Sequence, residues 1–385
     1  MSMGQGRGCY LDDRTHIATI TGYGSGGEGV ARLDDGRVAF IRGAARGDTC
    51  KIEIISERPR SYRAEIVEII EPSQHRIEPD CNVYKMCGGC DFRHITYEEE
   101  LRAKLNRVND AFERIGGFSI RANEIISTGQ IDGYRNKAVF HTANLDGRTV
   151  IGFYRAGSHE VCPVKRCRLL IDELNDFLSN LWDNPPAGYG EITLRSGCNN
   201  SHTTTEVNLD GLCFRISHSS FFQVNNGATL LLFQKARELA SLSKNETLVD
   251  IYCGVGALTL FIGRDAAYAL GVENNPDAVC DARENVRRNG FNHVDFICAD
   301  AAKWDATDIR PDCVVVDPPR SGLSAAAVRK ILEMSPARIV YISCNPATLA
   351  RDIKRLVSYE ARQVCVIDMF PRTANVECCV LLCRF

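Results

Sequence analysis

The hydrophobic pattern of the chain changes its period near residue 225. From about residue 17 to residue 71, runs such as GRVAFIRG, CKIEIIS and YRAEIVEIIE alternate apolar and polar residues between Gly- and Arg-rich turns. A period of two predicts half-buried strands, and the spacing of the runs fits a small five-stranded barrel of the oligonucleotide-binding (OB) type. We therefore expect residues 10–71 to form an N-terminal β-barrel.

The middle of the chain combines one clear helix with strands. Apolar residues recur at helical spacing over residues 97–115, and Gly116-Gly117 ends the pattern. Residues 125–216 predict mostly strands and turns, with one short helix around residues 169–181. We expect residues 72–216 to form a small central α+β domain whose helix 97–115 packs on the third domain.

Strands and helices alternate over residues 217–385. Helical patterns at about residues 227–242, up to 289, 325–334 and 348–356 separate short apolar runs. This alternation predicts an α/β, Rossmann-like domain with a doubly wound parallel sheet, whose ligands lie beyond the carboxyl ends of the strands.

Composition narrows the function classes. The 385 residues suggest two or three domains, and the net charge of −3 argues against a protein that holds nucleic acid by bulk electrostatics alone. Residues 133–168 hold seven Lys and Arg residues against two acids, with aromatic residues between them. Such a stretch can hold phosphates and stack bases, although a solvated strand face has the same pattern.

We expect a cytoplasmic, monomeric protein without a membrane span. No run approaches the roughly 18–20 apolar residues of a spanning helix, the N-terminus lacks the apolar stretch of a secretion signal, and no coiled-coil pattern is present. The eighteen cysteines should then be thiols rather than disulfides, and those in VECCVLLCRF are expected to be ordinary buried side chains.

The first three predicted strands of the third domain end in residues suited to a nucleoside-containing cofactor. Strand 248–251 runs into YCGVG, where Gly254 and Gly256 permit close backbone approach, and the next two strands end in Glu273 and Asp300. An acid after the second strand can accept ribose hydroxyls, and Asp300 suits an adenine amine. Leu258 stands near the third glycine of a dinucleotide motif. The spacing resembles that of the S-adenosylmethionine methyltransferases.

The last motifs supply a nucleophile and a base. A strand ends in the rigid turn DPPR, which begins at Asp317, and the following strand ends at Cys344. A thiolate that adds to carbon 6 of a pyrimidine makes carbon 5 nucleophilic, and a base must later remove the carbon 5 proton. Glu377, in FPRTANVE, is the candidate base. A buried strand thiol and a surface carboxylate are the ordinary alternatives, but the position behind a cofactor pattern favours catalysis.

A separate cysteine group indicates a metal site. Cys81, Cys87 and Cys90 have the spacing C-x5-C-x2-C, and the compact CGGC pair lets two thiolates face one centre. The spacing does not decide between zinc, the default for such a pair, and an iron–sulfur cluster. Either needs a fourth ligand, for which Cys162 and Cys167 are the candidates.

The segments DPPRSGL, YISCNPATLARD and FPRTANVE resemble the RNA uracil-5-methyltransferases, which form 5-methyluridine in tRNA and 23S rRNA. The resemblance implies an RNA substrate, S-adenosylmethionine as methyl donor, an N-terminal TRAM domain, and donor contacts from Gln223, Tyr252 and Asp317. The chain departs from the pattern at Asn375, where His is common, and at Ala257, where Asn is common.

The resemblance also selects a cluster. Iron–sulfur members of the family read C-x5-C-G-G-C and later S-H-x7-C, and Ser158-His159 is followed at that spacing by Cys167. This implies a 4Fe-4S cluster on Cys81, Cys87, Cys90 and Cys167, with a structural or RNA-orienting role.

Two other functions fit parts of the sequence. Cytosine-5 methyltransferases use the same covalent logic, but they usually carry Pro before the nucleophile, where this chain has Ser343. A non-enzymatic iron–sulfur RNA-binding factor would need only the barrel, the basic stretch and the cysteine group. The motifs do not distinguish a tRNA substrate from an rRNA substrate.

Overall fold

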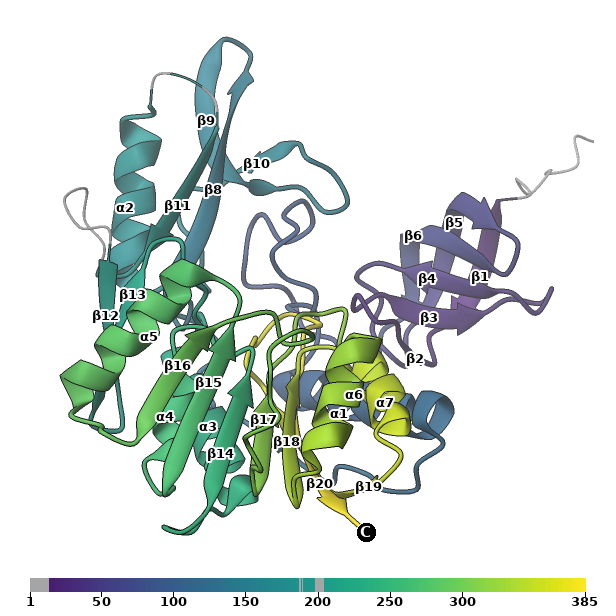
Figure 1. The fold of residues 1–385 in the computed structure, drawn as a ribbon. Coiled ribbons are helices and arrows are strands. Elements are labelled where there is room, and N and C mark those ends of the chain that lie inside the picture. The colour runs from purple at the N-terminus through teal and green to yellow at the C-terminus, as the bar shows by residue number, and fades with distance from the viewer. Residues whose placement is uncertain (1–13, 187, 189, 198–203) are drawn as a thin grey trace, which may run out of the picture. The chain divides into compact units, whose positions relative to one another are not determined.

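The computed structural model describes residues 14–186, 188, 190–197 and 204–385. The chain divides into two compact units (Figure 1): residues 1–103 with 372–374, and residues 104–371 with 375–385. The predicted barrel boundary, residues 10–13, lies outside the described residues. The three-part division at residues 71 and 216 is finer than these two units and stays a prediction.

The first unit contains a β-sheet built from short amphipathic strands. Cys50 and Ile52 are buried while Glu53 is exposed, as the alternating pattern requires. The sheet has six strands rather than the predicted five, because residues 22–23 form a short additional strand. In the order β1-β5-β6-β4-β3-β2, they are β1 (Thr15–Thr19), β2 (Gly22–Tyr23), β3 (Gly29–Arg32), β4 (Val38–Ile41), β5 (Thr49–Arg58) and β6 (Ser61–Glu71).

Helix α1 (Tyr97–Ala111) continues as a π-helical turn, η1 (Phe112–Gly116), and Gly117, with φ 70°, ends it. In the second unit, a four-stranded sheet of order β10-β9-β8-β11 is accompanied by α2, whose Leu174 and Leu178 are buried. A two-stranded hairpin follows. These elements are β8 (Lys137–Leu145), β9 (Arg148–Tyr154), β10 (Val161–Pro163), α2 (Asp172–Asp183), β11 (Glu191–Arg195), β12 (Thr204–Leu209) and β13 (Leu212–Ser217).

The large sheet of the second unit has eight strands in the order β16-β15-β14-β17-β18-β20-β19-β7. The strands are β7 (Ile125–Ile126), β14 (Thr247–Ile251), β15 (Tyr268–Glu273), β16 (Val294–Cys298), β17 (Cys313–Val316), β18 (Arg338–Ser343), β19 (Tyr359–Ile367) and β20 (Glu377–Arg384). The helices are α3 (Asn226–Ala240), α4 (Ala257–Gly263), α5 (Pro276–Asn289), α6 (Ala325–Met334) and α7 (Pro346–Arg355).

Helices cover both faces of this sheet (Figure 1). The apolar side chains of α3, α4 and α5 join one buried core, and those of η1, α6 and α7 join the other. Strands β14 to β18 are mutually parallel, whereas β20 lies between β18 and β19 and is antiparallel to both. The predicted doubly wound sheet is therefore present, with one reversed strand.

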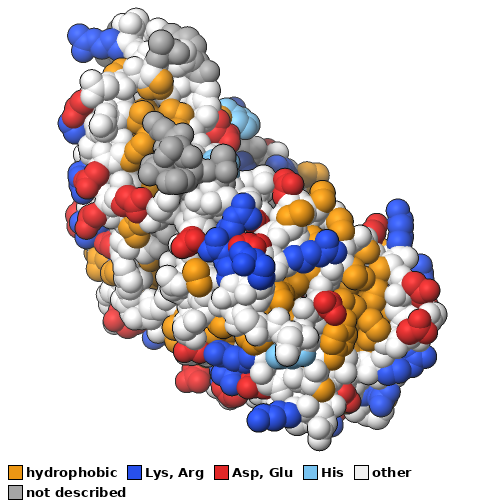
Figure 2. Space-filling model, turned by 60° about the vertical axis from the view of Figure 1, so that its left-hand side comes forward, with side chains coloured by type: hydrophobic (Ala, Val, Ile, Leu, Met, Phe, Trp, Pro, Cys, Tyr) orange, Lys and Arg blue, Asp and Glu red, His pale blue; other side chains and the backbone are white. Residues whose placement is uncertain are grey.

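Basic and acidic side chains are interspersed on the face in Figure 2, in keeping with the net charge of −3. In the basic stretch of residues 133–168, four cations pair with carboxylates, which favours a solvated face there. The pairs are Arg155–Glu160, Lys165–Asp183, Arg166–Asp176 and Arg168–Asp132. None of the described helices has the length and hydropathy needed to cross a membrane.

Candidate active site at the carboxyl edge of the large sheet

The predicted active-site residues of the second unit follow strands that end at one edge of the sheet. Because β14 to β18 are parallel, the residues after Ile251, Val316 and Ser343 emerge at the same edge. Strand β20 runs the opposite way and therefore begins at this edge, with Glu377. Residues far apart in sequence are thus brought to one end of the sheet.

The loop after β14 contains two glycines with different roles. Gly254 and Gly256 have φ angles of 54° and 75°, in the left-handed region that favours glycine. A Cβ on Gly256 would come within 2.4 Å of the Phe296 ring, whereas a Cβ on Gly254 would have nothing within 4 Å. Gly256 is therefore needed for close packing, and the open space beside Gly254 permits the approach of a ligand.

The two acids at the next strand ends are held by backbone amides. Glu273 accepts hydrogen bonds from the N–H groups of Gly254 at 3.1 Å and of Asn274 and Asn275 at 2.9 Å. Asp300 accepts one from Ala302 N–H at 2.8 Å, and its side chain is 49% exposed. Both carboxylates are thus held at the carboxyl edge of the sheet. There they can accept hydrogen bonds from the hydroxyl groups and the amine of a nucleoside.

Gln223 lies in the segment between β13 and α3, which is tied down on both sides. Asn225 caps α3 by accepting from Ala228 N–H at 3.1 Å and donates to the Met369 carbonyl at 3.1 Å. Asn136 N–H donates to the Val224 carbonyl at 2.8 Å. The half-buried Gln223 amide has no hydrogen bond with any of the described residues, so its polar atoms can serve a ligand.

Tyr252, directly after β14, adopts a strained backbone for a residue with a side chain, with φ 70°. Burial raises the pKa of its hydroxyl, and the neighbouring Asp300 acts in the same direction. The hydroxyl therefore stays protonated near neutral pH and can donate a hydrogen bond.

Cys344, directly after β18, and Glu377, the first residue of β20, lie opposite one another. Ser343 of β18 pairs with Cys378 of β20 in antiparallel register, so the residue after Ser343 faces the residue before Cys378. The Cys344 thiol is free and half-buried, while Glu377 is buried. The register therefore places the Cys344 thiol beside the Glu377 carboxyl group at the sheet edge.

Burial changes the acidity of these groups. Desolvation, followed by the charge of Glu377, raises the pKa of the Cys344 thiol, and Arg320 opposes this rise. Desolvation and then Asp317 raise the pKa of Glu377 well above its ordinary value. Desolvation raises the pKa of Asp317 itself to about 7. A buried carboxyl with a raised pKa is suited to proton transfer.

Arg320 has a role that the sequence did not reveal. Its guanidinium donates to the Asn375 side-chain oxygen at 3.1 Å, and its backbone carbonyl accepts from Asn345 at 3.1 Å. Its positive charge lowers the pKa of both Cys344 and Glu377. Its position three residues after Asp317 in the DPPR turn was the only sequence signal for this role.

Asp352 holds the backbone that directly follows the DPPR turn. This buried carboxylate accepts from Leu323 N–H at 2.7 Å and from the Tyr341 hydroxyl at 2.9 Å. It also pairs with Arg351 and Arg355 at 2.9 Å. The ARD triplet of α7 thus fixes the turn that carries Arg320.

The four predicted cluster ligands are distributed over both units. Cys81, Cys87 and Cys90 belong to the first unit and Cys167 to the second. The Gly89 N–H donates to the Cys87 sulfur at 3.4 Å. Within the part of the chain that the structure describes, no group of three His, Cys, Asp or Glu side chains is arranged to hold a metal ion.

Two family models match the chain. The model described as tRNA (Uracil-5-)-methyltransferase matches residues 197–385, and the TRAM domain matches residues 14–67. A solved structure, the Pyrococcus abyssi tRNA (uracil-54, C5)-methyltransferase with S-adenosyl-L-homocysteine, superposes with a TM-score of 0.76. It is 22% identical and covers 95% of this chain and 100% of its own. The predicted class I methyltransferase fold with an N-terminal TRAM barrel is confirmed.

Relatives extend over almost the whole chain. A protein of Gloeobacter violaceus described as an uncharacterized RNA methyltransferase is 32% identical over 98% of each chain. A similarly described protein of Clostridium acetobutylicum is 33% identical over 97% of this chain and 96% of its own. The chain therefore belongs to the RNA methyltransferases of the tRNA (uracil-5-)-methyltransferase family.

Proposed function

We propose that this RNA methyltransferase transfers a methyl group from S-adenosylmethionine to carbon 5 of a specific uridine, with Cys344 as nucleophile and Glu377 as base. The pairing of Ser343 with Cys378, which sets these two side chains opposite each other, is the observation that carries the proposal. Asp317 and the exposed Arg320 lie at the same edge, and both act on the pKa of Glu377.

In the proposed reaction, the Cys344 thiolate forms a bond to carbon 6 of the uracil, and the electron pair of the 5,6 double bond passes into an enolate. When bound, S-adenosylmethionine supplies the electrophilic methyl group to carbon 5. Glu377, in its ionised carboxylate form, then takes the proton from carbon 5, and the released electron pair restores the double bond while Cys344 leaves as thiolate. The protein needs no net redox change.

The donor is proposed to lie across the loop after β14. The open space beside Gly254 and the uncommitted Gln223 amide support this placement. Tyr252, Gly256, Glu273, Asp300 and Asp317 are the remaining residues proposed to contact or shape the donor site.

A mechanism-based RNA tests the covalent step. Fluorine at carbon 5 cannot be removed as a proton, so 5-fluorouridine RNA should trap the Cys344 adduct after methyl transfer. We expect a denaturation-stable protein–RNA complex with the wild type and with Cys383→Ala, and none with Cys344→Ala. A stable complex formed by Cys344→Ala would refute the assignment of the nucleophile.

The proposed RNA is tRNA, because the matching family model and the solved structure are both described as tRNA enzymes. Mapping 5-methyluridine in a strain that lacks the protein tests this. Loss of the modification from tRNA is expected, whereas loss from 23S rRNA alone would assign the other substrate. Labelled methyl transfer to uracil- and cytosine-containing RNA separates uracil from cytosine methylation, and only the uracil RNA should be labelled.

We also propose the 4Fe-4S cluster on Cys81, Cys87, Cys90 and Cys167. Its support is the cysteine spacing and the Gly89 N–H directed at the Cys87 sulfur, a contact that stabilises thiolate ligands. Anaerobically purified protein should contain iron and acid-labile sulfide, and Cys87→Ser should lose both while Cys162→Ser keeps them. Zinc in place of iron would contradict the proposal.

We propose a cytoplasmic protein that acts as a monomer on its RNA. Light scattering coupled to gel filtration should give one mass near 42.7 kDa, and a stable dimer would contradict the proposed state.

A further inference from the structure

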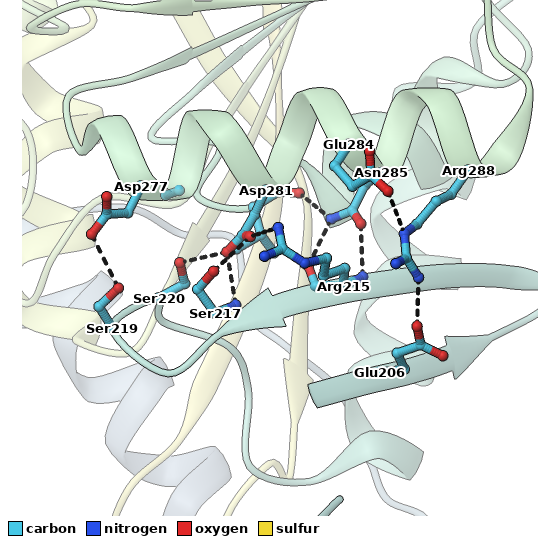
Figure 3. Close-up of polar contacts among 12 residues, drawn as sticks. Glu206, Arg215, Ser217, Ser219, Ser220, Asp277, Asp281, Glu284, Asn285 and Arg288 are labelled. Atoms are coloured by element: carbon cyan, nitrogen blue, oxygen red, sulfur yellow. Dashed lines mark hydrogen bonds and ion pairs between the residues drawn. The ribbon is translucent and has the colours of Figure 1, made fainter. Parts of the chain in front are cut away.

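The β12–β13 hairpin is docked on α5 by a ladder of side chains (Figure 3). Strand β13 pairs only with β12 among the described strands, so its second edge lacks a strand neighbour. Asn289 accepts from Cys213 N–H and donates to its carbonyl, each at 2.8 Å. Asn285 accepts from Arg215 N–H at 2.7 Å and donates to its carbonyl at 3.1 Å.

The third rung of the ladder is Asp281, which accepts from Ser217 N–H at 2.8 Å. The three rungs are four residues apart on the helix, a rise of about 6 Å. They meet alternate residues of β13, which are about 6.6 Å apart along a strand. One face of α5 thus takes the place of a neighbouring strand, because each asparagine amide donates and accepts as a backbone peptide does.

Two of these helix residues, Asn285 and Asp281, also contact segments of the proposed donor site. Asn285 donates a second hydrogen bond to the Val255 carbonyl at 3.0 Å, and Val255 stands between Gly254 and Gly256. Asp281 accepts from the Ser220 hydroxyl at 2.8 Å, and Ser220 lies three residues before Gln223.

Both rungs are rigidly held. Asp281 and Asn285 are fully buried, and Asp281 also accepts from the Ser217 hydroxyl at 2.8 Å and from Arg215 at 2.9 Å. The outer contacts of Figure 3 are weaker supports, since Arg288 and Glu206 form a partly exposed ion pair and Ser219 meets Asp277 at the surface.

We propose that Asp281 and Asn285 are positioning residues for the methyl donor. They fix the Gly254–Gly256 loop and the Gln223 segment at one separation by binding both to the same helix face, without touching the donor. The inference rests on the proposed function, in which the loop and Gln223 contact S-adenosylmethionine.

Binding measurements with two matched alanine variants test the inference. Asn285→Ala and Asn289→Ala each remove one rung with two donated hydrogen bonds, but only Asn285 reaches the donor loop. Calorimetric titration with S-adenosylmethionine should give a Kd about tenfold higher for Asn285→Ala, with kcat at saturating donor within about twofold of wild type. Asn289→Ala should keep the wild-type Kd.

A second pair covers the case in which Asn285→Ala does not fold. Ser220→Ala removes one hydroxyl contact to Asp281 and should raise the donor Kd about threefold, whereas Ser219→Ala should leave it unchanged. Equal Kd values within either pair would overturn the inference. Failure of the proposed function is distinguishable, because the wild type itself would then not bind S-adenosylmethionine.

Discussion

The Arg320 guanidinium donates a hydrogen bond to the Asn375 side-chain oxygen at 3.1 Å, joining the turn after β17 to the segment before β20. Asn375 is the position at which the sequence departs from the histidine common in related enzymes. Through this contact, Asn375 orients the guanidinium of Arg320, which faces Cys344 and Glu377.

Loss of this contact should slow formation of the covalent adduct. In Asn375→Ala the guanidinium loses one partner, and one hydrogen bond of about 0.5–1.5 kcal/mol corresponds to a rate lower by about twofold to thirteenfold. Asn375→His should stay near the wild-type rate, because an imidazole nitrogen can accept the same hydrogen bond. Adduct formation with 5-fluorouridine RNA in a quench experiment measures both variants, and an unchanged rate in Asn375→Ala would dismiss the role.

Adduct formation should accelerate with pH. Only the thiolate adds to carbon 6, and burial together with Glu377 raises the pKa of Cys344, so the thiolate is scarce at neutral pH. In the ligand-free enzyme the midpoint of Cys344 alkylation by iodoacetamide should lie above the ordinary thiol value of about 8.5. Asp317 acts in the same direction and Arg320 in the opposite one.

Variants of Arg320 serve as the control for the pH dependence of Cys344 alkylation. Arg320→Gln should move the alkylation midpoint further up, because the only opposing cation among the named neighbours is lost, whereas Arg320→Lys should hold it near the wild-type position. A midpoint in Arg320→Gln that is unchanged from the wild type, or lower, would show that this cation does not govern the thiol.

Glu377→Gln should trap the reaction rather than prevent it. The amide cannot take the carbon 5 proton, so the adduct on ordinary uridine RNA should form, accept the methyl group and accumulate. Gel analysis of the protein–RNA complex checks this, with Glu360→Gln, an exposed carboxylate of β19, as the control. Rapid turnover by Glu377→Gln would assign the base to another residue.

The two glycines of the donor loop should respond differently to alanine. Gly254→Ala places a methyl group in open space and strains a positive φ, a cost of about 1 kcal/mol, so the fold should survive while donor affinity falls. Gly256→Ala drives a methyl group against the Phe296 ring and should lower the free energy of unfolding by about 1–3 kcal/mol. Thermal unfolding and donor titration separate the two effects.

Asp352 should be important for stability. Asp352→Ala leaves Leu323 N–H and two arginines without their buried acceptor, and the expected loss is about 3–5 kcal/mol in the free energy of unfolding. Tyr341→Phe removes only one hydrogen bond to the same carboxylate and should cost about 1 kcal/mol. Urea unfolding of both variants provides the comparison, and similar losses would contradict the central role of Asp352.

Local patterns predicted the helices well because their signals are short-range. The structure gives α6 the predicted residues Ala325–Met334, and α7 begins at Pro346 rather than Thr348 because proline is favoured in the first helical turn. The short helix predicted near residues 169–181 is α2, shifted to Asp172–Asp183.

The arrangement of the last strands could not be predicted from the sequence. Apolar runs predict two strands there, but nothing local specifies that β20 enters between β18 and β19 in the reverse direction. Cys344 and Glu377 were paired on chemistry and resemblance, and their register emerges only from this tertiary placement. The ladder on α5 was missed for the same reason, because its asparagines resemble solvent-exposed helix residues.

The central position of β20 also affects the biosynthesis of the enzyme. Strands β18 and β19 leave the ribosome before β20, and their inner edges meet only through it. Until residue 384 has emerged, the apolar β18 has an unpaired edge that is open to pairing with other strands. Glu377 belongs to that same late strand, so the proposed base and the completed sheet arrive together.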